Sequence, residues 1–275
     1  MNSDWPTGEP LVRLGFFFGI LILMVVWEVL APRRRLQTSK PARWFSNLGI
    51  VFIDTLVLRL LPSYSAIYIS LLAENGGWGL LNNVSLVYWL KVIIGIIVLD
   101  LAIYLQHAMF HGIPLLWRLH MMHHSDLDFD VTTGVRFHPI EILLSMGIKM
   151  VVVLLVGISS LGVLIFEVLL NATSLFNHGN VRLGASIDRV LRLFVVTPEM
   201  HRVHHSVIIR ETNSNFGFNL PWWDRLFGTY KAHPAAGHLE MTIGLSQYRD
   251  PKRLNLPGLL LLPFTGKTSK YPMGP

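Results

Sequence analysis

Eight of the twelve histidines of this chain fall into three groups with the spacing of an α-helix. His107 and His111 are four residues apart, and H-x-x-H-H occurs at His120–His124 and again at His201–His205. Offsets of three and four residues return to one helix face, so each group presents its imidazoles together. Packing does not explain such a pattern, whereas a metal site does. Eight imidazoles exceed the needs of one ion, so the pattern predicts two ions and requires the three segments to meet.

Composition limits the chemistry and the setting of this site. Cysteine is absent, so any metal must be held by nitrogen and oxygen, and imidazole suits iron, zinc, copper and nickel alike. With 52% hydrophobic and 15% charged residues, the chain does not resemble a soluble globular protein. The net charge is +6, but the basic residues are not gathered on an aromatic-bearing domain. An anionic membrane surface is therefore the expected partner, and nucleic acid is not.

The apolar runs predict an all-α integral membrane protein. Leu11–Ala31 has about the 20 residues that a membrane-crossing helix needs. Basic residues follow this run instead of preceding it, which indicates a retained span, a cytoplasmic loop at Arg33–Arg43 and an N-terminus outside. Leu48–Ala73, kinked at Pro62, and Val84–Gln106 predict the second and third spans.

Residues Ile142–Phe176 predict a helical hairpin. A single helix of this length would measure about 52 Å, well beyond the roughly 30 Å hydrocarbon core. Gly157 and Gly162 bracket a break, so we expect arms at Ile142–Val156 and Leu161–Phe176, either crossing the membrane or re-entering it shallowly. About three full spans plus this hairpin would leave every histidine group on the cytoplasmic side, in one histidine-rich helical catalytic region.

We expect three parts along the chain. Residues 1–83 would form the N-terminal transmembrane helices with their basic loop, residues 84–230 the catalytic domain and residues 231–275 a C-terminal extension. Within the extension, Leu256–Phe264 is too short to span and should lie in the membrane interface or fold against the catalytic region. Lys267–Pro275 should form a loose tail.

Further motifs accompany the histidines in a fixed order. They are D-x-x-x-Y-x-x-H-x-x-x-H (Asp100–His111), W-x-x-H-x-x-H-H-S (Trp117–Ser125), R-x-H-P-x-E (Arg136–Glu141), N-H-G-N (Asn177–Asn180), P-x-x-H-x-x-H-H-S (Pro198–Ser206), N-F-G (Asn215–Gly217) and W-D-R-L-F-G-T (Trp223–Thr229). This order resembles the fatty acid hydroxylase/sterol desaturase superfamily of membrane histidine-box di-iron oxidoreductases. The resemblance covers about residues 84–230 and is specific for the superfamily rather than for one enzyme.

The resemblance implies a non-haem di-iron centre at the cytoplasmic face. Its ligands would be His107, His111, His120, His123, His124, His178, His201, His204 and His205, with His138 as a less certain member. Some members of the superfamily carry another histidine four residues before the one at 178. This chain has Ser174 there, so that ligand would come from water or from His138.

The resemblance also implies the reaction and its partners. Two iron ions would use O2 as a co-substrate to hydroxylate or desaturate a C–H bond of a lipid such as a sterol, a fatty acyl chain or a glycerol ether. Electrons would come from an external redox protein, such as a cytochrome or a ferredoxin with its reductase. The compact chain without an evident retention signal favours a bacterial inner membrane.

Ligating imidazoles usually donate their second N–H to an acceptor. Candidates for residues supporting the ligands in this way are Asp100, Tyr104, Asp126, Glu141, Asn180 and Asp224. Asp100 could instead be solvated, and Asp224 could instead pair with Arg225 or Arg202. Trp222 and Trp223 are either an interfacial anchor, the favoured alternative, or a wall of the substrate site. No residue beyond the metal ligands is assigned a catalytic role.

Two other functions are compatible with a histidine-rich membrane protein. A zinc-dependent membrane hydrolase would need an acidic base beside the metal, as in H-E-x-x-H, and no histidine pair here encloses a glutamate. A non-enzymatic metal transporter or sensor would place its ligands in mid-membrane, whereas these histidines flank the spans at one edge. Both alternatives are therefore less favoured than an oxidoreductase.

Overall fold

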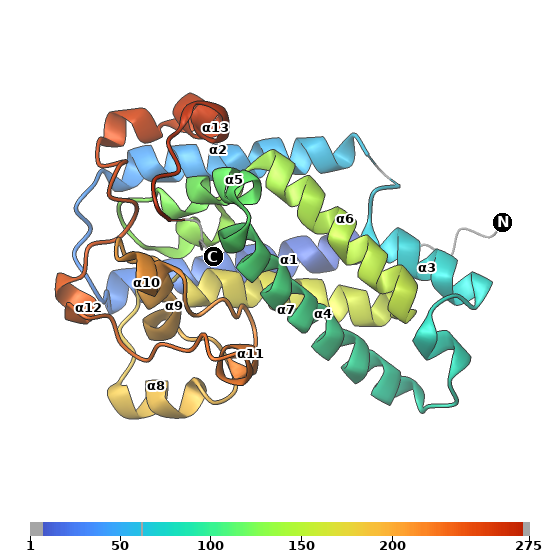
Figure 1. Cartoon of the computed structure of the whole chain (residues 1–275). Helices are drawn as coiled ribbons and strands as arrows, with labels where there is room; N and C mark the ends of the chain where they lie inside the picture. The colour runs from blue at the N-terminus through green and yellow to red at the C-terminus, as the bar shows by residue number, and fades with distance from the viewer. Residues whose placement is uncertain (1–7, 62, 272–275) are drawn as a thin grey trace.

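The computed structural model describes residues 8–61 and 63–271, and within them the fold is helical, with two isolated β-bridges and no strand (Figure 1). Among these residues, four helices are long and apolar enough to cross a membrane: α1 (Glu9–Leu30), α4 (Tyr88–Gly112), α6 (Pro139–Val156) and α7 (Ser160–Asn177). The other helices are α2 (Lys40–Arg59), α3 (Ala66–Gly76), η1 (Leu80–Asn83), α5 (Pro114–His124), η2 (Val131–Val135), α8 (Ala185–Leu191), α9 (Pro198–His204), α10 (Ile209–Thr212), α11 (Trp222–Leu226), α12 (Gly237–Glu240), η3 (Pro251–Leu254) and α13 (Leu256–Thr265). The predicted all-α membrane fold is confirmed.

The break predicted inside the long apolar segment is present between α6 and α7. Gly157 caps α6 in the left-handed conformation at φ 73°, which glycine adopts without strain. A Cβ at this position would lie 2.8 Å from the carbonyl oxygen of Trp78. Ser159 starts α7 by accepting the backbone N–H of Gly162 on its hydroxyl. This turn reverses the chain and returns α7 toward the end of the bundle where α6 begins (Figure 1).

The prediction of one kinked helix over Leu48–Ala73 is wrong, because this segment divides into α2 and α3. The predicted kink at Pro62 falls outside the described residues. α2 begins at Lys40, before the apolar run, and has two different faces: Phe45 and Phe52 are exposed, whereas Asn47 and Asp54 are buried. α2 is therefore amphipathic, and the candidate spans are α1, α4 and the α6–α7 pair.

The bundle core lies between α3, α4, α6 and α7. It is built from Leu99 and Ile103 of α4, Val153 of α6, and Val163 and Phe166 of α7. α4 runs toward the end of the bundle where α1 finishes, and α5 and α9 lie at that same end (Figure 1). The α6–α7 pair thus returns the chain so that α9 lies beside α5. This placement is required if the histidines of α5 and α9 are to share one site.

The basic loop after α1 is hydrogen-bonded to later segments of the chain rather than free. The guanidinium of Arg33 donates to Glu199 at 2.6 Å, and that of Arg34 donates to the carbonyls of His238 and Met241. Farther on, Arg43 pairs with Asp126 at 2.7 Å. These charges therefore stabilise the fold in addition to any role in membrane orientation.

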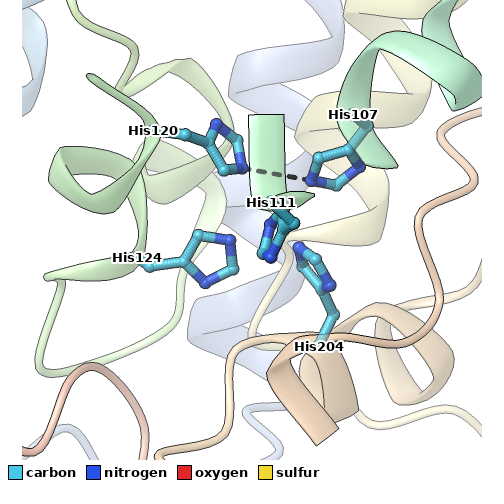
Figure 2. Close-up of side chains that lie close together, drawn as sticks. All are labelled: His107, His111, His120, His124 and His204. Atoms are coloured by element: carbon cyan, nitrogen blue, oxygen red, sulfur yellow. Dashed lines mark hydrogen bonds between the residues drawn. The ribbon is translucent and has the colours of Figure 1, made fainter. Parts of the chain in front are cut away.

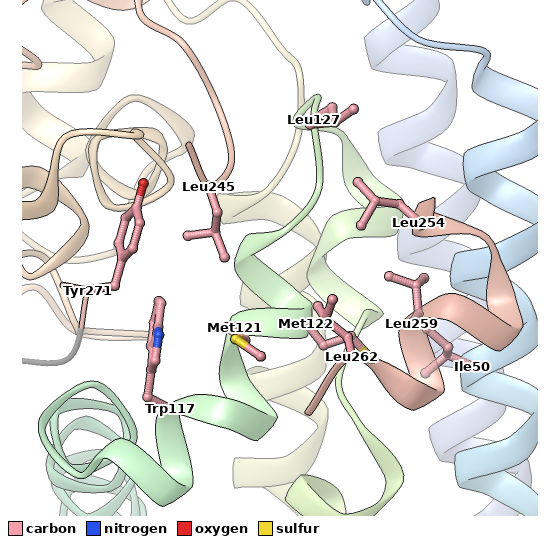
Figure 3. Close-up of a cluster of buried hydrophobic side chains, with 10 residues drawn as sticks. All are labelled: Ile50, Trp117, Met121, Met122, Leu127, Leu245, Leu254, Leu259, Leu262 and Tyr271. Carbon is pink, nitrogen blue, oxygen red and sulfur yellow. The ribbon is translucent and has the colours of Figure 1, made fainter. Parts of the chain in front are cut away.

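The C-terminal apolar segment forms α13, which folds against α2 and α5, one of the two positions expected for it. Leu259 and Leu262 of α13 pack in a cluster with Ile50 of α2 and with Trp117 and Met121 of α5 (Figure 3).

The expectation of a loose tail from Lys267 onward is wrong as far as Tyr271, and residues 272–275 lie outside the described part. The ring of Tyr271 is buried and stacks on Trp117 with 5.8 Å between centroids. Its hydroxyl donates to the carbonyl oxygen of Val207 at 3.0 Å.

Candidate metal centre

Nine histidines converge at one end of the helix bundle in two adjacent groups. The first contains His107, His111, His120, His124 and His204 (Figure 2), and the second contains His123, His178, His201 and His205. Within each group, one possible ligand atom of every residue lies within 4.8 Å of the others. The structure therefore brings together all three histidine groups of the sequence and adds His178.

Short helices that begin with proline carry the two H-x-x-H-H motifs. α5 starts at Pro114 and α9 at Pro198, where the fixed φ of proline suits the first helical position. Thr197 caps α9 by accepting the N–H of Met200 on its hydroxyl. His107 and His111 lie on the last turns of α4, and His178 caps the end of α7. Four separate segments thus supply the imidazoles.

Each H-x-x-H-H motif contributes to both groups. From α5, His120 and His124 join the first group and His123 the second; from α9, His204 joins the first, while His201 and its neighbour His205 join the second. The groups therefore adjoin: the rings of His124 and His205 stack with 4.6 Å between centroids. The arrangement therefore offers two adjoining sets of nitrogen donors, each of which could hold a metal ion.

Six of the nine imidazoles have an acceptor at Nδ1. Their acceptors are backbone carbonyls in four cases and side-chain oxygens in two: His107 to Phe216 O (2.8 Å), His111 to Asn213 Oδ1 (3.0 Å), His120 to Glu141 Oε1 (2.6 Å), His123 to Arg136 O (3.2 Å), His178 to Ser174 O (2.8 Å) and His204 to Ser214 O (2.7 Å). A proton on Nδ1 leaves the lone pair of Nε2 free, which is the usual arrangement of a ligating histidine.

The free nitrogens fit a metal ion. Nε2 of His111, His124 and His204 is buried without a hydrogen-bond partner among the described residues, which is costly unless a cation binds there. Nε2 of His107 and Nε2 of His120 lie 3.1 Å apart. Two nitrogens bound to one ion at about 2.1 Å and at right angles would be separated by about 3.0 Å. The donor set is all nitrogen and uncharged, which suits a first-row transition ion.

Burial keeps the imidazoles neutral. Desolvation lowers the pKa of His120 and of His178 to about 3. It also lowers the pKa of His123 and of His204 well below the ordinary value, and neighbouring imidazoles add to this effect. Because a metal binds the neutral form, the site is prepared for a cation at neutral pH without first losing protons.

Aromatic rings enclose the two groups. Phe137 stacks on His123 with 4.5 Å between centroids, Phe129 lies against His178 at 5.5 Å, and Phe218 lies against His107 at 5.1 Å. These side chains replace water around the imidazoles with apolar surface, which strengthens electrostatic interactions inside the pocket.

The family model described as fatty acid hydroxylase matches residues 92–229, a segment that contains all nine grouped histidines. The chain belongs to the fatty acid hydroxylase family. Two similar proteins are ornithine lipid hydroxylase OlsE of Rhizobium tropici, 32% identical over 154 residues, and alkylglycerol monooxygenase of Homo sapiens, 27% identical over 228 residues. The matches cover 56% and 79% of this chain but only 45% and 46% of those proteins, so the chain spans about half the length of these relatives. No solved structure matches the chain.

Of the six acceptors predicted from the sequence, Glu141 is hydrogen-bonded directly to a grouped histidine, His120. Asp224 supports His107 indirectly. Its carboxylate accepts the backbone N–H groups of Phe216 and Gly217 at 2.7 and 2.9 Å. These bonds fix the backbone at Phe216, whose carbonyl is hydrogen-bonded to His107. Asp224 does not depend on Arg225 or Arg202 for a hydrogen bond.

Asp126 also supports the site indirectly. It binds Arg43, and Arg136, whose carbonyl holds His123, lies 3.7 Å from it. Burial would raise the pKa of Asp126, but Arg43 and Arg136 hold it below its usual range.

The other three predicted acceptors have partners outside the two groups. Asp100 is buried and not solvated, and its carboxylate accepts the indole N–H of Trp223 at 2.8 Å. The Tyr104 hydroxyl is hydrogen-bonded to Thr229 at 2.8 Å, and Asn180 is hydrogen-bonded to the backbone of Arg34. These residues position segments of the chain rather than individual imidazoles.

His138, the less certain of the ligands that the resemblance implies, lies outside both groups. Its Nδ1 accepts the N–H of Ile140 as the cap of α6, and its Nε2 is hydrogen-bonded to the carbonyl of Leu260 at 3.2 Å. Both nitrogens are therefore used by the fold. The Ser174 hydroxyl donates to the carbonyl of Gly134, so it does not replace the histidine that some family members carry there.

Sequence reasoning missed Asn213 and the backbone acceptors. Asn213 lies two residues before the N-F-G motif, and its side chain holds His111. The carbonyls of Ser214 and Phe216 lie in the same segment. Asparagine close to a motif was a detectable signal for Asn213, but a carbonyl belongs to every residue and leaves no trace in the sequence.

Proposed function

We propose that this chain is a membrane-bound, non-haem di-iron enzyme that uses O2 and external electrons to hydroxylate a C–H bond of a lipid. The observation that carries the proposal is the convergence of nine buried, neutral imidazoles in two adjacent groups within a hydroxylase family segment. The five-histidine group would hold one ion and the four-histidine group the other.

The reaction requires more than side chains can supply. Converting C–H to C–OH with O2 consumes two electrons and two protons and releases water, and none of the amino-acid side chains is a sufficiently strong oxidant. Bound iron, which changes oxidation state, would supply that chemistry. Redox-inert zinc would not.

The chain's own residues would bind the metal ions, orient the imidazole rings and shield the site from water. Nε2 atoms present lone pairs because Nδ1 is held elsewhere, and Glu141 fixes the ring of His120 at 2.6 Å. Phe137, Phe129 and Phe218 limit water around the rings, which protects reactive species from side reactions.

A lipid substrate is supported by the relatives and by the position of the site. The names of the two relatives specify a lipid hydroxylase and an alkylglycerol monooxygenase, which favours oxygen insertion over desaturation. His107, His111 and His178 lie at the C-terminal ends of α4 and α7, two helices that could cross a membrane, so a lipid could reach the site from the bilayer. The Arg33–Arg43 loop lies at the same end, and the positive-inside rule then favours the cytoplasmic side, where a cytochrome or a ferredoxin with its reductase could deliver electrons. The similarity to a Rhizobium protein is compatible with a bacterial inner membrane.

A zinc hydrolase is less well supported. Within the described residues, Glu141 is the carboxylate that hydrogen-bonds to a grouped histidine, and it does so at Nδ1 of His120. It is thus committed to orienting a ring, whereas a hydrolytic base must face a metal-bound water.

Isotopic oxygen tests the proposal. Iron-loaded protein in nanodiscs would receive a chemical reductant, a lipid extract and 18O2, and mass spectrometry would follow the lipids. We expect one labelled oxygen atom in each product molecule and no product without O2. Oxygen-independent turnover, or label entering only from H2 18O, would refute an O2-dependent hydroxylase.

A further inference from the structure

Seven large apolar side chains are exposed together on α8, α11 and the residues next to them. They are between 45% and 69% exposed and form what we call the α8–α11 patch: Ile187, Val190, Leu193, Phe194, Trp222, Leu226 and Phe227. The two helices are joined by a hydrogen bond from the Trp222 indole to the carbonyl of Leu193 at 2.7 Å and by one from Arg225 to Arg192. Monomeric soluble proteins rarely expose so many neighbouring apolar side chains, so this surface needs a partner.

The α8–α11 patch is attached to the apolar helix α4. Phe227 stacks on Tyr104 of α4 with 5.3 Å between centroids and an interplanar angle of 15°. The carboxylate of Asp100, one turn earlier on α4, accepts the indole N–H of Trp223. Both contacts fix the patch beside the last third of α4, whose side chain Leu105 is half exposed.

The position along α4 indicates the depth of the patch in the membrane. The helix begins with the exposed rings of Tyr88 and Trp89, and a rise of about 1.5 Å per residue places Tyr104 about 24 Å from Tyr88. Between these ends α4 exposes Leu90 and Ile93. Aromatic rings collect at both boundaries of a hydrocarbon core of about 30 Å, so the patch falls at the boundary on the histidine side.

The charges around the patch match an anionic lipid surface. Arg189 of α8 and Arg225 of α11 are exposed, as is Arg182, three residues before α8. Asp188, within α8, is buried and bound to Arg192 and to the hydroxyl of Thr197. Apolar side chains with basic neighbours and a tryptophan are the features of a surface that enters the headgroup region of a bilayer.

We propose that the α8–α11 patch is embedded in the leaflet on the histidine side, with its apolar side chains among the upper acyl chains and its arginines at lipid phosphates. The catalytic region is then fixed at the membrane by this patch as well as by the crossing helices. Trp222 is an interfacial anchor, and the patch faces lipid whatever chemistry the histidines support. The inference is therefore independent of the proposed reaction.

Spin labelling tests this surface cleanly, because the chain has no cysteine and one introduced cysteine is the only labelling site. The patch variants are Val190→Cys, Phe194→Cys and Leu226→Cys, and the controls are Arg35→Cys and Arg210→Cys, which are also exposed but lie outside the patch. The full chain would be reconstituted in nanodiscs of phosphatidylcholine and phosphatidylglycerol. Power saturation would compare collisions of each nitroxide with O2, which enters lipid, and with a neutral nickel chelate, which stays in water.

Embedding predicts a several-fold higher ratio of O2 to nickel-chelate collisions at the three patch sites than at the two controls. Patch labels as accessible to the nickel chelate as Arg35→Cys and Arg210→Cys would overturn the proposal. So would labels shielded from both reagents with dipolar coupling between two labelled chains, because that result identifies a second copy as the occupant. Use of three separate exposed sites protects the test against one variant that does not fold.

Discussion

At the scale of single residues, the two nitrogens of each anchored histidine have different tasks. Nδ1 is held by a named acceptor in six of the nine rings. In four of these six, Nε2 lies 3.1–3.2 Å from Nε2 of another ring of the same group: His107 with His120 and His123 with His178. Glu141 is the carboxyl group among these acceptors, and its hydrogen bond to His120, at 2.6 Å, is the shortest of the six. The ring of His120 therefore depends on one side chain that can be changed without altering any ligand.

Replacing Glu141 should weaken metal binding without removing a ligand. We expect Glu141→Ala to lower iron affinity by about 10- to 100-fold, because the orientation and basicity of His120 depend on this acceptor. Glu141→Gln should lose less, since an amide oxygen still accepts the Nδ1 proton. Tyr104→Phe is the matched control, because the Tyr104 hydroxyl contacts Thr229 and no grouped histidine. Chelator competition measures the affinities, and an unchanged affinity in Glu141→Ala would contradict this role.

Stability should depend on pH through the same histidines. The pKa of His120 and of His178 falls to about 3 on burial, from an ordinary value of 6.5. Between these values the unfolded chain binds protons that the folded chain does not, so the free energy of unfolding decreases as pH falls, by about 1.4 kcal/mol per pH unit for each ring. We expect the metal-free protein in detergent to melt at steadily lower temperature from about pH 7 to about pH 5. A constant melting temperature over this window would be incompatible with neutral buried rings.

Eight of the nine grouped histidines were predictable because helical spacing determines which rings share a face, whereas His178 was expected only from the family resemblance. The spacing did not predict that each H-x-x-H-H motif divides between two groups, which depends on how α5 and α9 pack. The position of His138 outside the groups was unpredictable for a related reason. A histidine at a helix start has the same one-letter context whether it binds a metal or caps the helix, as His138 does.

At the scale of elements, the turn between α6 and α7 determines at which end of the helix bundle the second H-x-x-H-H motif lies. Gly157→Ala should destabilise the protein by about 1–2 kcal/mol, because the residue has φ +73° and an added Cβ meets a carbonyl at 2.8 Å. Gly19→Ala in α1 is the control, since its Cβ would enter open space and alanine favours a helix. Unfolding in detergent measures both variants, and equal stability of the two would contradict the role of the turn.

Hydropathy located the glycine turn but misjudged α2 and α3. An average over Leu48–Ala73 hides the fact that polar and apolar residues occupy opposite faces of α2. The buried polar face of α2 makes hydrogen bonds to residues far along the chain. Asn47 donates to Thr132 and accepts from Arg136. Such partners cannot be predicted from a local window.

At the scale of the whole molecule, the histidines of α5 and α9 can meet because the chain reverses direction between α6 and α7. The sequence predicted this reversal, since one straight helix over Ile142–Phe176 was too long for the membrane and Gly157 and Gly162 bracketed a break. It did not predict how the C-terminal extension packs on the rest of the chain. Tyr271 stacks on Trp117, which lies beside His111 of the first histidine group, and the Tyr271 hydroxyl contacts Val207. That contact joins residues remote in the chain and has no local signature.

The number of iron ions bound per chain tests the central claim most directly. Protein loaded with iron without O2, then freed of loose metal, should contain two irons per chain, one for each histidine group. The His138→Ala variant should still bind two irons, whereas His124→Ala should bind fewer than two. Of these two residues, His124 belongs to a histidine group and His138 does not. One ion per chain in the unchanged protein, or persistent occupation by zinc with no iron, would contradict a di-iron centre.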